Sequence, residues 1–209
     1  MSRTVQQSET QIESIAQFQE VINRRIEASI AVKQGLLRHA EVCAQVAETL
    51  IRAIRRGNKV LLFGNGGSAA DAQHIAAELV GRYYLDRPAL PAQALTVNTS
   101  SLTAIANDYD YDQIFSRQFD AFGQAGDVAI GISTSGNSRN VLKAFRAAKR
   151  KDMITVGMTG ESGGQFKAEV DYCICVPSSD TPRIQEAHIL VGHILSELVE
   201  EAIFGESYG

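Results

Sequence analysis

Residues 60–68 read Val60-Leu61-Leu62-Phe63-Gly64-Asn65-Gly66-Gly67-Ser68 and set the architecture expected for the whole chain. Four apolar residues run into a glycine-rich turn, and residues 69–80 after the turn fit a helix. When a strand is followed by such a turn and then by a helix, the turn and the start of the helix present free backbone N–H groups to an anion. The sequence therefore predicts a strand–loop–helix unit suited to a phosphorylated ligand.

Outward from this unit, short apolar runs alternate with helical patterns. Strands are expected at residues 59–63, 92–97, 127–132, 153–158 and 172–176, and helices at 69–80, 100–106, 137–150, 164–168 and 181–203. This alternation predicts an α/β fold, in which the five strands form a mostly parallel sheet flanked by helices on both faces, with ligands at the carboxyl ends of the strands.

Apolar residues recur at helical spacing over residues 10–56, and Gly57 provides a stop signal. We expect two long helices here, which either cover the sheet or pack against a second copy, and we favour an oligomer. The 209 residues fit one domain over 1–209, with 1–57 as a helical extension used in packing and oligomerisation and 58–209 as the α/β core.

Composition argues against several classes of partner. A formal net charge of −4 disfavours a nucleic-acid-binding surface. We expect no membrane span, because no apolar stretch is long enough, and the N-terminus lacks the apolar core of a secretion signal. A cytoplasmic protein is the expectation.

Three cysteines, Cys43, Cys173 and Cys175, form no even framework and no C-x-x-C motif, so we expect reduced, buried thiols. Cys173 and Cys175 alternate with one residue on a predicted strand and would therefore face the same side. Packing is a better explanation of this pair than metal binding.

A second loop follows the strand expected at 127–132 and reads Ser133-Thr134-Ser135-Gly136-Asn137-Ser138. Its four hydroxyls and its glycine stand before a helix, where hydroxyl and amide groups donate to phosphate oxygens. Helix capping explains one of these residues but not the whole run. We therefore predict a phosphate-binding loop.

A dinucleotide site is the alternative for the first loop, because Gly64-x-Gly66-x-x-Ala69 fits the fingerprint. A dinucleotide site requires a carboxylate after the second strand, which binds the ribose hydroxyls. Residues 96–100, Thr-Val-Asn-Thr-Ser, supply none, so a dehydrogenase is disfavoured.

Polar residues also interrupt two apolar helices. His74 and Glu78 stand one turn apart on the helix at 69–80, and Gln185 and His193 lie on adjacent faces of the last helix. A solvated surface pair and packing histidines are the ordinary explanations. Two imidazoles, a carboxylate and an amide at one pocket would suit a divalent metal, zinc above all. His188 is expected on another face, and the spacing leaves open whether the four converge.

Further motifs are Gly81-Arg82-Tyr83, Asn107-Asp108, which in isolation is typical of a turn, and Arg183-Ile184-Gln185-Glu186 ahead of His188 and His193. With the two loops, they make the chain resemble the bacterial sedoheptulose 7-phosphate isomerases, or phosphoheptose isomerases, of the sugar-isomerase (SIS) superfamily. The resemblance covers nearly the whole sequence. It implies a three-layer, flavodoxin-like fold and a homotetramer whose active sites lie between subunits.

The resemblance also implies roles for individual residues. Substrate contacts fall on Asn65, Gly66, Gly67, Glu78, Asn107, Asp108, Ser133, Thr134, Ser135, Ser138 and Gln185. It implies that one zinc ion per subunit is bound by His74, Glu78, Gln185 and His193. It also implies that Glu78 and His193 are the acid/base pair.

The implied reaction converts sedoheptulose 7-phosphate to glycero-manno-heptose 7-phosphate through an enediol, the first step of nucleotide-activated heptose biosynthesis. We assign Glu78 as the base at C1 and C2 and His193 as the acid toward the oxygens. A non-catalytic SIS protein that binds the replication initiator is the alternative, but such proteins typically lack a carboxylate at the position of Glu78 and an imidazole at that of His193. A sugar-phosphate sensor is disfavoured because no DNA-binding segment is attached, and a different phosphosugar stays open.

Overall fold

The computed structural model describes residues 15–208, and its centre is a parallel sheet with the strand order β2-β1-β3-β4-β5. The strands are β1 (Val60–Gly64), β2 (Ala92–Ala94), β3 (Val128–Ile132), β4 (Ile154–Thr159) and β5 (Tyr172–Cys175). The predicted five-stranded parallel sheet is confirmed. The start of the first predicted helix, including Ile12, and the segment expected to lack a secretion signal lie outside the described residues.

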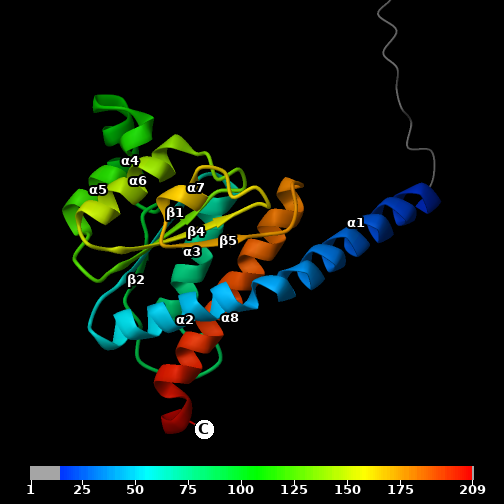
Figure 1. Cartoon of the computed structure of the whole chain (residues 1–209), viewed down its shortest axis with the longest axis horizontal. Helices are drawn as coiled ribbons and strands as arrows, with labels where there is room; N and C mark the ends of the chain where they lie inside the picture. Colours follow the sequence, from blue (N-terminus) through cyan, green and yellow to red (C-terminus); the bar gives the residue numbers. More distant parts are fainter. Residues whose placement is uncertain (1–14, 209) are drawn as a thin grey trace, which may run out of the picture.

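Helices cover both faces of this sheet, in the three-layer arrangement that the sequence predicts (Figure 1). The helices of residues 15–208 are α1 (Ile15–Gly35), α2 (Ala40–Arg55), α3 (Gly67–Val80), α4 (Thr99–Asp108), α5 (Ser116–Phe122), α6 (Arg139–Arg150), α7 (Phe166–Glu169) and α8 (Thr181–Tyr208), with 3-10 turns at Leu36–His39 and Tyr111–Gln113.

Side chains alternate between the two faces along each strand, which divides the core into two clusters. Leu62 and Ile130 pack with apolar residues of α2, α3 and α8, whereas Leu61, Phe63 and Ala129 pack with those of α5, α6 and α7. Both β1 and β3 are buried on both faces, as expected for the centre of a parallel sheet. Their apolar runs therefore predict their position.

The order of the strands reverses between β1 and β3, and this crevice is where open α/β sheets bind ligands. Gly64 pairs in register with Ile132, so the loops that follow the two strands start side by side. The two loops that the sequence assigns to phosphate are thus neighbours at one edge of the sheet.

Several boundaries differ from the prediction. Helix α5 was not predicted: its seven residues are too few for a helical period, although Phe119 packs edge-on against Phe63 with ring centroids 5.0 Å apart. Strand β2 has three residues rather than six, because the chain turns away after Ala94. Asn107 and Asp108 form the last turn of α4 instead of a separate turn.

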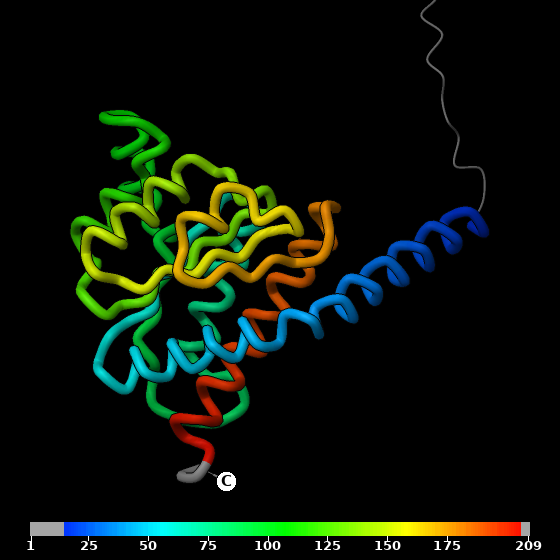
Figure 2. Tube along the Cα trace, viewed as in Figure 1, coloured from blue at the N-terminus to red at the C-terminus, as the bar shows by residue number. Residues whose placement is uncertain are grey.

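The two N-terminal helices behave differently. Helix α2 covers the sheet with Val46 and Leu50, whereas α1 projects from the body and buries none of its residues (Figure 2). Phe18, Ile22, Ile26 and Ile30, spaced four apart, are about half exposed. Among residues 15–208, the apolar stripe of α1 therefore has no covering partner, although α1 contacts α8 near Ser29 and Arg25.

All three cysteines are free thiols, as predicted, but each is half-buried, so the expectation of buried thiols is wrong. Cys173 and Cys175 lie on β5, an edge strand with a neighbour on one side only, which leaves them partly exposed. Within residues 15–208, no helix combines the length and the apolar character needed to cross a membrane.

Candidate functional site

The loop after β1 depends on glycine at two positions. Gly66 has φ +55° and ψ −122°, a conformation that side chains disfavour. A Cβ at Gly64 would lie 2.8 Å from the carbonyl oxygen of Ile132, so the loop can approach β3 only without one. Asn65 stands between them, and its amide exchanges hydrogen bonds of 2.9 and 2.8 Å with the amide of Asn140 on α6. The loop after β1 is therefore fixed against the element that follows β3.

The loop after β3 gathers its hydroxyls on one side. The hydroxyl oxygens of Ser133 and Ser138 are 2.8 Å apart, and those of Ser133 and Ser135 are 3.4 Å apart. Gly136 makes the turn between them with φ +64°. None of these serines caps α6 through its side chain, because the side chain of the N-cap residue Ser138 makes no bond to the helix. The hydroxyls are thus available to a ligand at the start of a twelve-residue helix, which is a favourable place for an anion.

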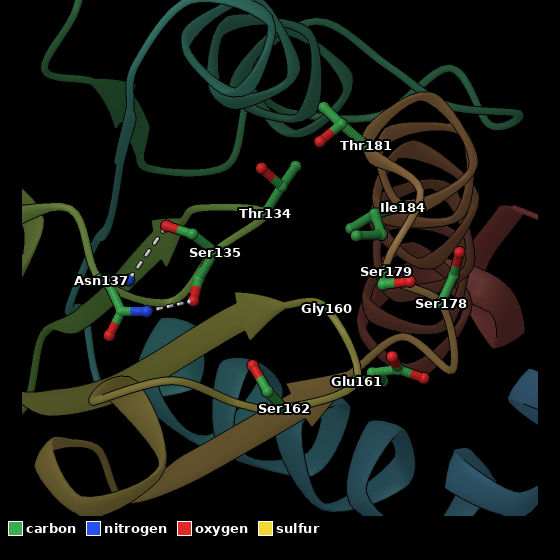
Figure 3. A pocket seen from close by; sticks show the side chains of 10 residues that line it. All are labelled: Thr134, Ser135, Asn137, Gly160, Glu161, Ser162, Ser178, Ser179, Thr181 and Ile184. Atoms are coloured by element: carbon green, nitrogen blue, oxygen red, sulfur yellow. Dashed lines mark hydrogen bonds between the residues drawn. The ribbon is translucent and has the colours of Figure 1, made fainter.

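A pocket of about 330 Å³ opens beside this loop (Figure 3). Its wall consists of Thr134, Ser135, Asn137, Gly160, Glu161, Ser162, Ser178, Ser179, Thr181 and Ile184. Most of these side chains carry a hydroxyl or an amide, and they come from the ends of β3, β4 and β5 and from the start of α8. The pocket is suited to a polyhydroxylated, phosphorylated molecule.

A cluster of three titratable side chains lies on α3 and α8. His74 Nε2 is 2.9 Å from Glu78 Oε1 and 3.3 Å from His193 Nε2. The close packing of the two helices brings them together: a Cβ at Gly192 would lie 2.5 Å from Ile75 Cδ1. Glu78 and His193, 115 positions apart in the sequence, therefore meet through His74 within one chain.

The three side chains suit a divalent metal. One ligand atom from each of His74, Glu78 and His193 lies within 4.8 Å of the others. For a tetrahedral zinc with Zn–N distances of about 2.0–2.1 Å, two nitrogen ligands stand about 3.3–3.4 Å apart. The separation of the two Nε2 atoms, 3.3 Å, agrees with that value. Imidazole and carboxylate ligands are also the chemistry that zinc prefers.

The side chain of Gln185 lies away from the histidine cluster. Its side-chain amide packs against Gly67 at the start of α3, where a Cβ on the glycine would lie 3.3 Å from Gln185 Oε1. Gln185 precedes His193 by eight residues, a rise of about 12 Å along α8. In the single chain it therefore belongs with the two loops rather than with the histidine cluster.

The other predicted residues lie in three places. Thr134 and Ser135 line the pocket. Asn107 donates a hydrogen bond of 2.9 Å to Asp108, and both side chains are exposed at the end of α4. His188 is fully buried with its Nε2 3.2 Å from the carbonyl oxygen of Thr159, and burial lowers its pKa to about 4. The prediction that His188 serves another face than His193 is confirmed.

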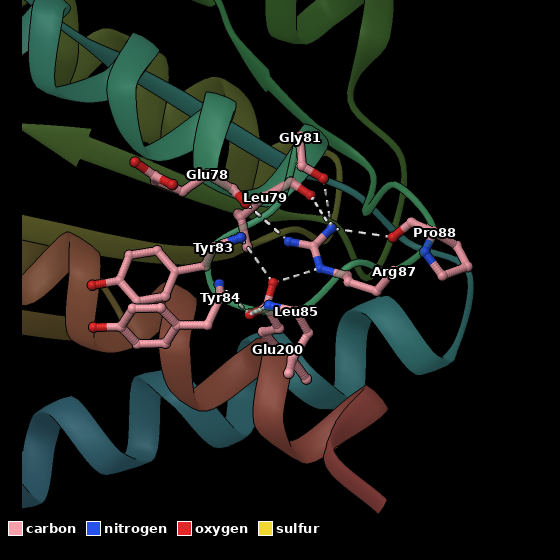
Figure 4. Close-up of polar contacts among 9 residues, drawn as sticks. All are labelled: Glu78, Leu79, Gly81, Tyr83, Tyr84, Leu85, Arg87, Pro88 and Glu200. Carbon is pink, nitrogen blue, oxygen red and sulfur yellow. Dashed lines mark hydrogen bonds and ion pairs between the residues drawn. The ribbon is translucent and has the colours of Figure 1, made fainter. Parts of the chain in front are cut away.

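Two residues that fix the end of α3, Arg87 and Glu200, were not predicted from the sequence (Figure 4). Arg87 Nη2 donates to the carbonyl oxygen of Glu78 at 2.9 Å, and its Nη1 donates to that of Leu79 at 2.7 Å, which satisfies the C-terminal end of α3. Arg87 Nε in turn donates to Glu200 at 2.8 Å, and both side chains are buried. The pair thus holds the helix end from which the Glu78 side chain projects.

Glu200 also fixes the segment after α3. Its carboxylate accepts hydrogen bonds from the backbone N–H groups of Tyr83, Tyr84 and Leu85 at 2.6 to 2.8 Å. Burial raises the pKa of this carboxyl, but the three N–H donors and Arg87 outweigh burial, and the net pKa is lowered. The motif Gly81-Arg82-Tyr83 is the part of the sequence analysis that lies closest to this network, but it did not predict the role of Glu200.

The loops and the histidine cluster lie at opposite ends of α3. Gly67 begins the helix beside the loops, and Glu78 follows eleven residues later, a rise of about 16 Å. A seven-carbon sugar phosphate spans about 10 Å when extended, at roughly 1.2 Å per bond. The rise between these two backbone positions exceeds the length of the sugar phosphate, and the Glu78 side chain, which tilts back toward the start of the helix, covers part of the difference.

Comparison with known proteins finds relatives that match over most of the chain. The model of the SIS domain family matches residues 17–160. Phosphoheptose isomerase of Aneurinibacillus thermoaerophilus is 56% identical over 190 residues, which cover 90% of this chain and 96% of the relative. Phosphoheptose isomerase of Clostridium acetobutylicum is 54% identical over 188 residues, with 88% and 96% covered.

Solved structures agree as well. A phosphoheptose isomerase from Neisseria gonorrhoeae superposes with a TM-score of 0.84 at 44% identity, covering 88% of this chain and 99% of that one. One from Francisella tularensis gives a TM-score of 0.84 at 35% identity, covering 87% and 97%.

Proposed function

This chain belongs to the phosphoheptose isomerases of the SIS domain family, and from that premise we propose how its own residues isomerise sedoheptulose 7-phosphate to glycero-manno-heptose 7-phosphate. The chain is an isomerase whose substrate is a phosphosugar. The observation that carries the proposal is the meeting of Glu78 and His193 around His74. A scaffold that only bound a partner protein would not need an acid and a base at one point.

Glu78 and His193 divide the proton transfers. The ketose has a carbonyl at C2 and a CH₂OH group at C1; Glu78 removes one C1 proton while the His193 imidazolium donates a proton to O2, which gives the enediol. Glu78 then returns its proton to C2, and His193, now neutral, takes the proton from O1, which leaves the carbonyl at C1. Protons and electrons balance over the cycle, and both groups end as they began.

We propose that His74, Glu78 and His193 also hold one zinc ion per chain. Family resemblance implies Gln185 as a fourth ligand, but in the single chain Gln185 lies with the loops, so we assign the ion to the three residues of the cluster. When bound, such an ion would keep the His193 imidazole neutral and would polarise the carbonyl and stabilise negative charge on the sugar oxygens in place of the proton that the imidazolium donates. Glu78 Oε1 faces His74, so Oε2 is the oxygen that we assign to the C1 and C2 protons.

The substrate's other end belongs to the loops after β1 and β3. Asn65, Gly66 and Gly67 would contact the sugar, and the hydroxyls of Ser133, Thr134, Ser135 and Ser138 would bind the phosphate, with Asn107 and Asp108 as further sugar contacts. Hydroxyls and backbone N–H groups hold a phosphate without a full positive charge, which suits a ligand that must leave again.

We infer that two copies of the chain complete each site. The separation of about 16 Å along α3 exceeds the length of the sugar phosphate, so the loops of one copy would work with the histidine cluster of another. Apolar side chains stand exposed close to the cluster along α3 and α8, among them Val80, Ile194 and Leu198, and α1 adds its own stripe. These surfaces support the homotetramer that family resemblance implies.

The three free thiols fit a reducing compartment, and we place the reaction in the cytoplasm. The identity of the sugar is tested directly. The purified protein is incubated with sedoheptulose 7-phosphate in D₂O, and aldose formation and deuterium entry at C1 and C2 are followed. Neither product nor exchange would contradict the proposal.

The variant Glu78→Gln tests the assigned base. It keeps the shape of the side chain but cannot take a proton, so both signals should fall about 10²- to 10⁴-fold with no change in unfolding temperature. Glu201→Gln, on an exposed part of α8, is the matched control and should keep full activity. Normal turnover in Glu78→Gln would refute the assignment.

A chelation experiment tests the metal separately. The metal content of the wild type and of His74→Ala is measured by atomic absorption, and activity is followed after chelation and after zinc is returned. We expect about one zinc per wild-type chain, less in the variant, and activity that follows zinc. Full activity in a metal-free sample would refute the zinc site while leaving the acid/base pair standing.

A further inference from the structure

Two thiols lie side by side on the edge of the sheet. Cys173 and Cys175 are next-but-one neighbours on β5, and their Sγ atoms are 3.6 Å apart. Residues two apart on a strand have Cα atoms separated by about 6.6 Å, and a disulfide tolerates up to about 6.8 Å. Both thiols are half-buried, so small molecules in solution can reach them.

The two sulfurs differ in reactivity. A hydrogen bond from Cys173 lowers the pKa of Cys175 to about 7, with a further contribution from the positive charge of Lys167 on α7. The same hydrogen bond, together with burial, raises the pKa of Cys173. Thiolate is the nucleophilic form, so Cys175 attacks first and Cys173 follows.

Cys175 is linked to the phosphate loop by direct packing. Gly163, on the segment between β4 and α7, lies against it: a Cβ on the glycine would stand 3.3 Å from Cys175 Sγ. The next residue, Gly164, lies against the loop after β3, where a Cβ would stand 2.5 Å from the carbonyl oxygen of Ser135. Phe166 N donates to the carbonyl oxygen of Gly136 at 3.1 Å. Residues 160–166 thus form a layer between the thiols and the phosphate loop.

We propose that Cys173 and Cys175 form a redox-sensitive modification site, in which an intramolecular disulfide loosens residues 160–166 from the phosphate loop. Bond formation brings the sulfurs from 3.6 Å to about 2.05 Å, a shift of about 1.5 Å that withdraws Cys175 from Gly163. The effect on substrate binding rests on the proposed function; formation of the disulfide and the change in the loop do not.

The oxidant is a low-molecular-weight disulfide of the glutathione class. The Cys175 thiolate attacks one of its sulfurs and releases one thiolate, which leaves a mixed disulfide on Cys175. Cys173, deprotonated, then attacks Cys175 Sγ, forms the internal bond and releases the second thiolate. Two electrons pass from the protein to the oxidant, and the two thiol protons go to the released thiolates.

The test uses the reduced full-length protein and oxidised glutathione. Peptide mass mapping of the wild type and of Cys43→Ser should show the loss of two hydrogens in the peptide that holds Cys173 and Cys175. Cys173→Ser should stop at a glutathione adduct on Cys175. A wild type that keeps the glutathione adduct, or does not react with an excess of the reagent, would overturn the proposal.

Amide hydrogen exchange tests the link to the phosphate loop without any activity measurement. The N–H groups of Gln165 and Phe166 bond to Asn137 and Gly136, and their exchange should become about tenfold faster in the oxidised protein. Unchanged exchange in a protein that carries the disulfide would overturn the coupling. In the assay with sedoheptulose 7-phosphate, oxidation should raise KM several-fold more than it lowers kcat, and Cys175→Ser, which can form neither the adduct nor the disulfide, should abolish that response.

Discussion

Two inactive variants of this chain are expected to restore activity when their subunits are mixed. Glu78→Gln removes the base at the end of α3, and Ser135→Asp places a like charge in the loop that would bind phosphate. Glu78 and Ser135 are both accessible to solvent, so both variants should fold. Each variant alone lacks one half of every site, and neither should turn over substrate.

The expected magnitude follows from the separation of the two half-sites. If the loops come from one copy and the cluster from another, random assembly of equal amounts gives about one quarter of sites with both halves intact. If one chain supplied the whole site, every site would carry one of the two defects and the mixture would stay inactive. Mixed assemblies at background activity would refute the shared site.

A dilution experiment gives an independent value. Wild type is mixed with an equal amount of the double variant Glu78→Gln/Ser135→Asp, and the subunits are exchanged under mild denaturant. A shared site predicts about one quarter of the wild-type activity per total protein, whereas a site within one chain predicts about one half. Native mass spectrometry of tagged chains verifies that the subunits exchanged.

Two further predictions concern stability and pH. Glu200→Gln leaves Arg87 buried without its counter-charge and should lower the free energy of unfolding by about 3 kcal/mol, measured by urea titration, whereas the exposed neighbour Glu201→Gln should change it little. Because the folded pKa of Glu200 lies below its ordinary value of 4.5, its contribution should be lost as pH falls from about 4.5 through the folded pKa, and the variant should lack this acid-dependent loss. The pKa of His188 is lowered from 6.5 to about 4 in the folded protein, so as pH falls the unfolded chain binds the proton first. The free energy of unfolding should therefore decrease as pH falls from 6.5 to about 4. His188→Gln should flatten this dependence on pH, and an unchanged dependence would contradict the explanation.

The sheet could be predicted from the sequence because its signals are local. The apolar run 60–63 and the glycines after it specify a strand and a turn by themselves, and β1 and its loop appear where expected. Helix α5 could not be predicted in this way. Its seven residues are fixed by tertiary packing of Phe119 against Phe63, which no short sequence window contains.

The contacts of the histidine cluster could be predicted from the sequence only in part. His74 and Glu78 are one turn apart, so their contact follows from helix geometry. The approach of His193 depends on the packing of α3 against α8 at Gly192, and the ion pair of Arg87 with Glu200 joins residues 113 positions apart. Such contacts are set by tertiary packing, which periodicity does not report.

The division of the site follows from the direction of α3. The helix starts at the carboxyl edge of the sheet, where parallel strands gather their loops, and must run away from that edge to pack across the sheet. The backbone at Glu78 therefore lies about 16 Å along the helix from the loop at Gly67 of the same chain. We propose that a second copy brings a cluster to each loop and that the exposed stripe of α1 and the apolar residues beside His193 hold that copy in place.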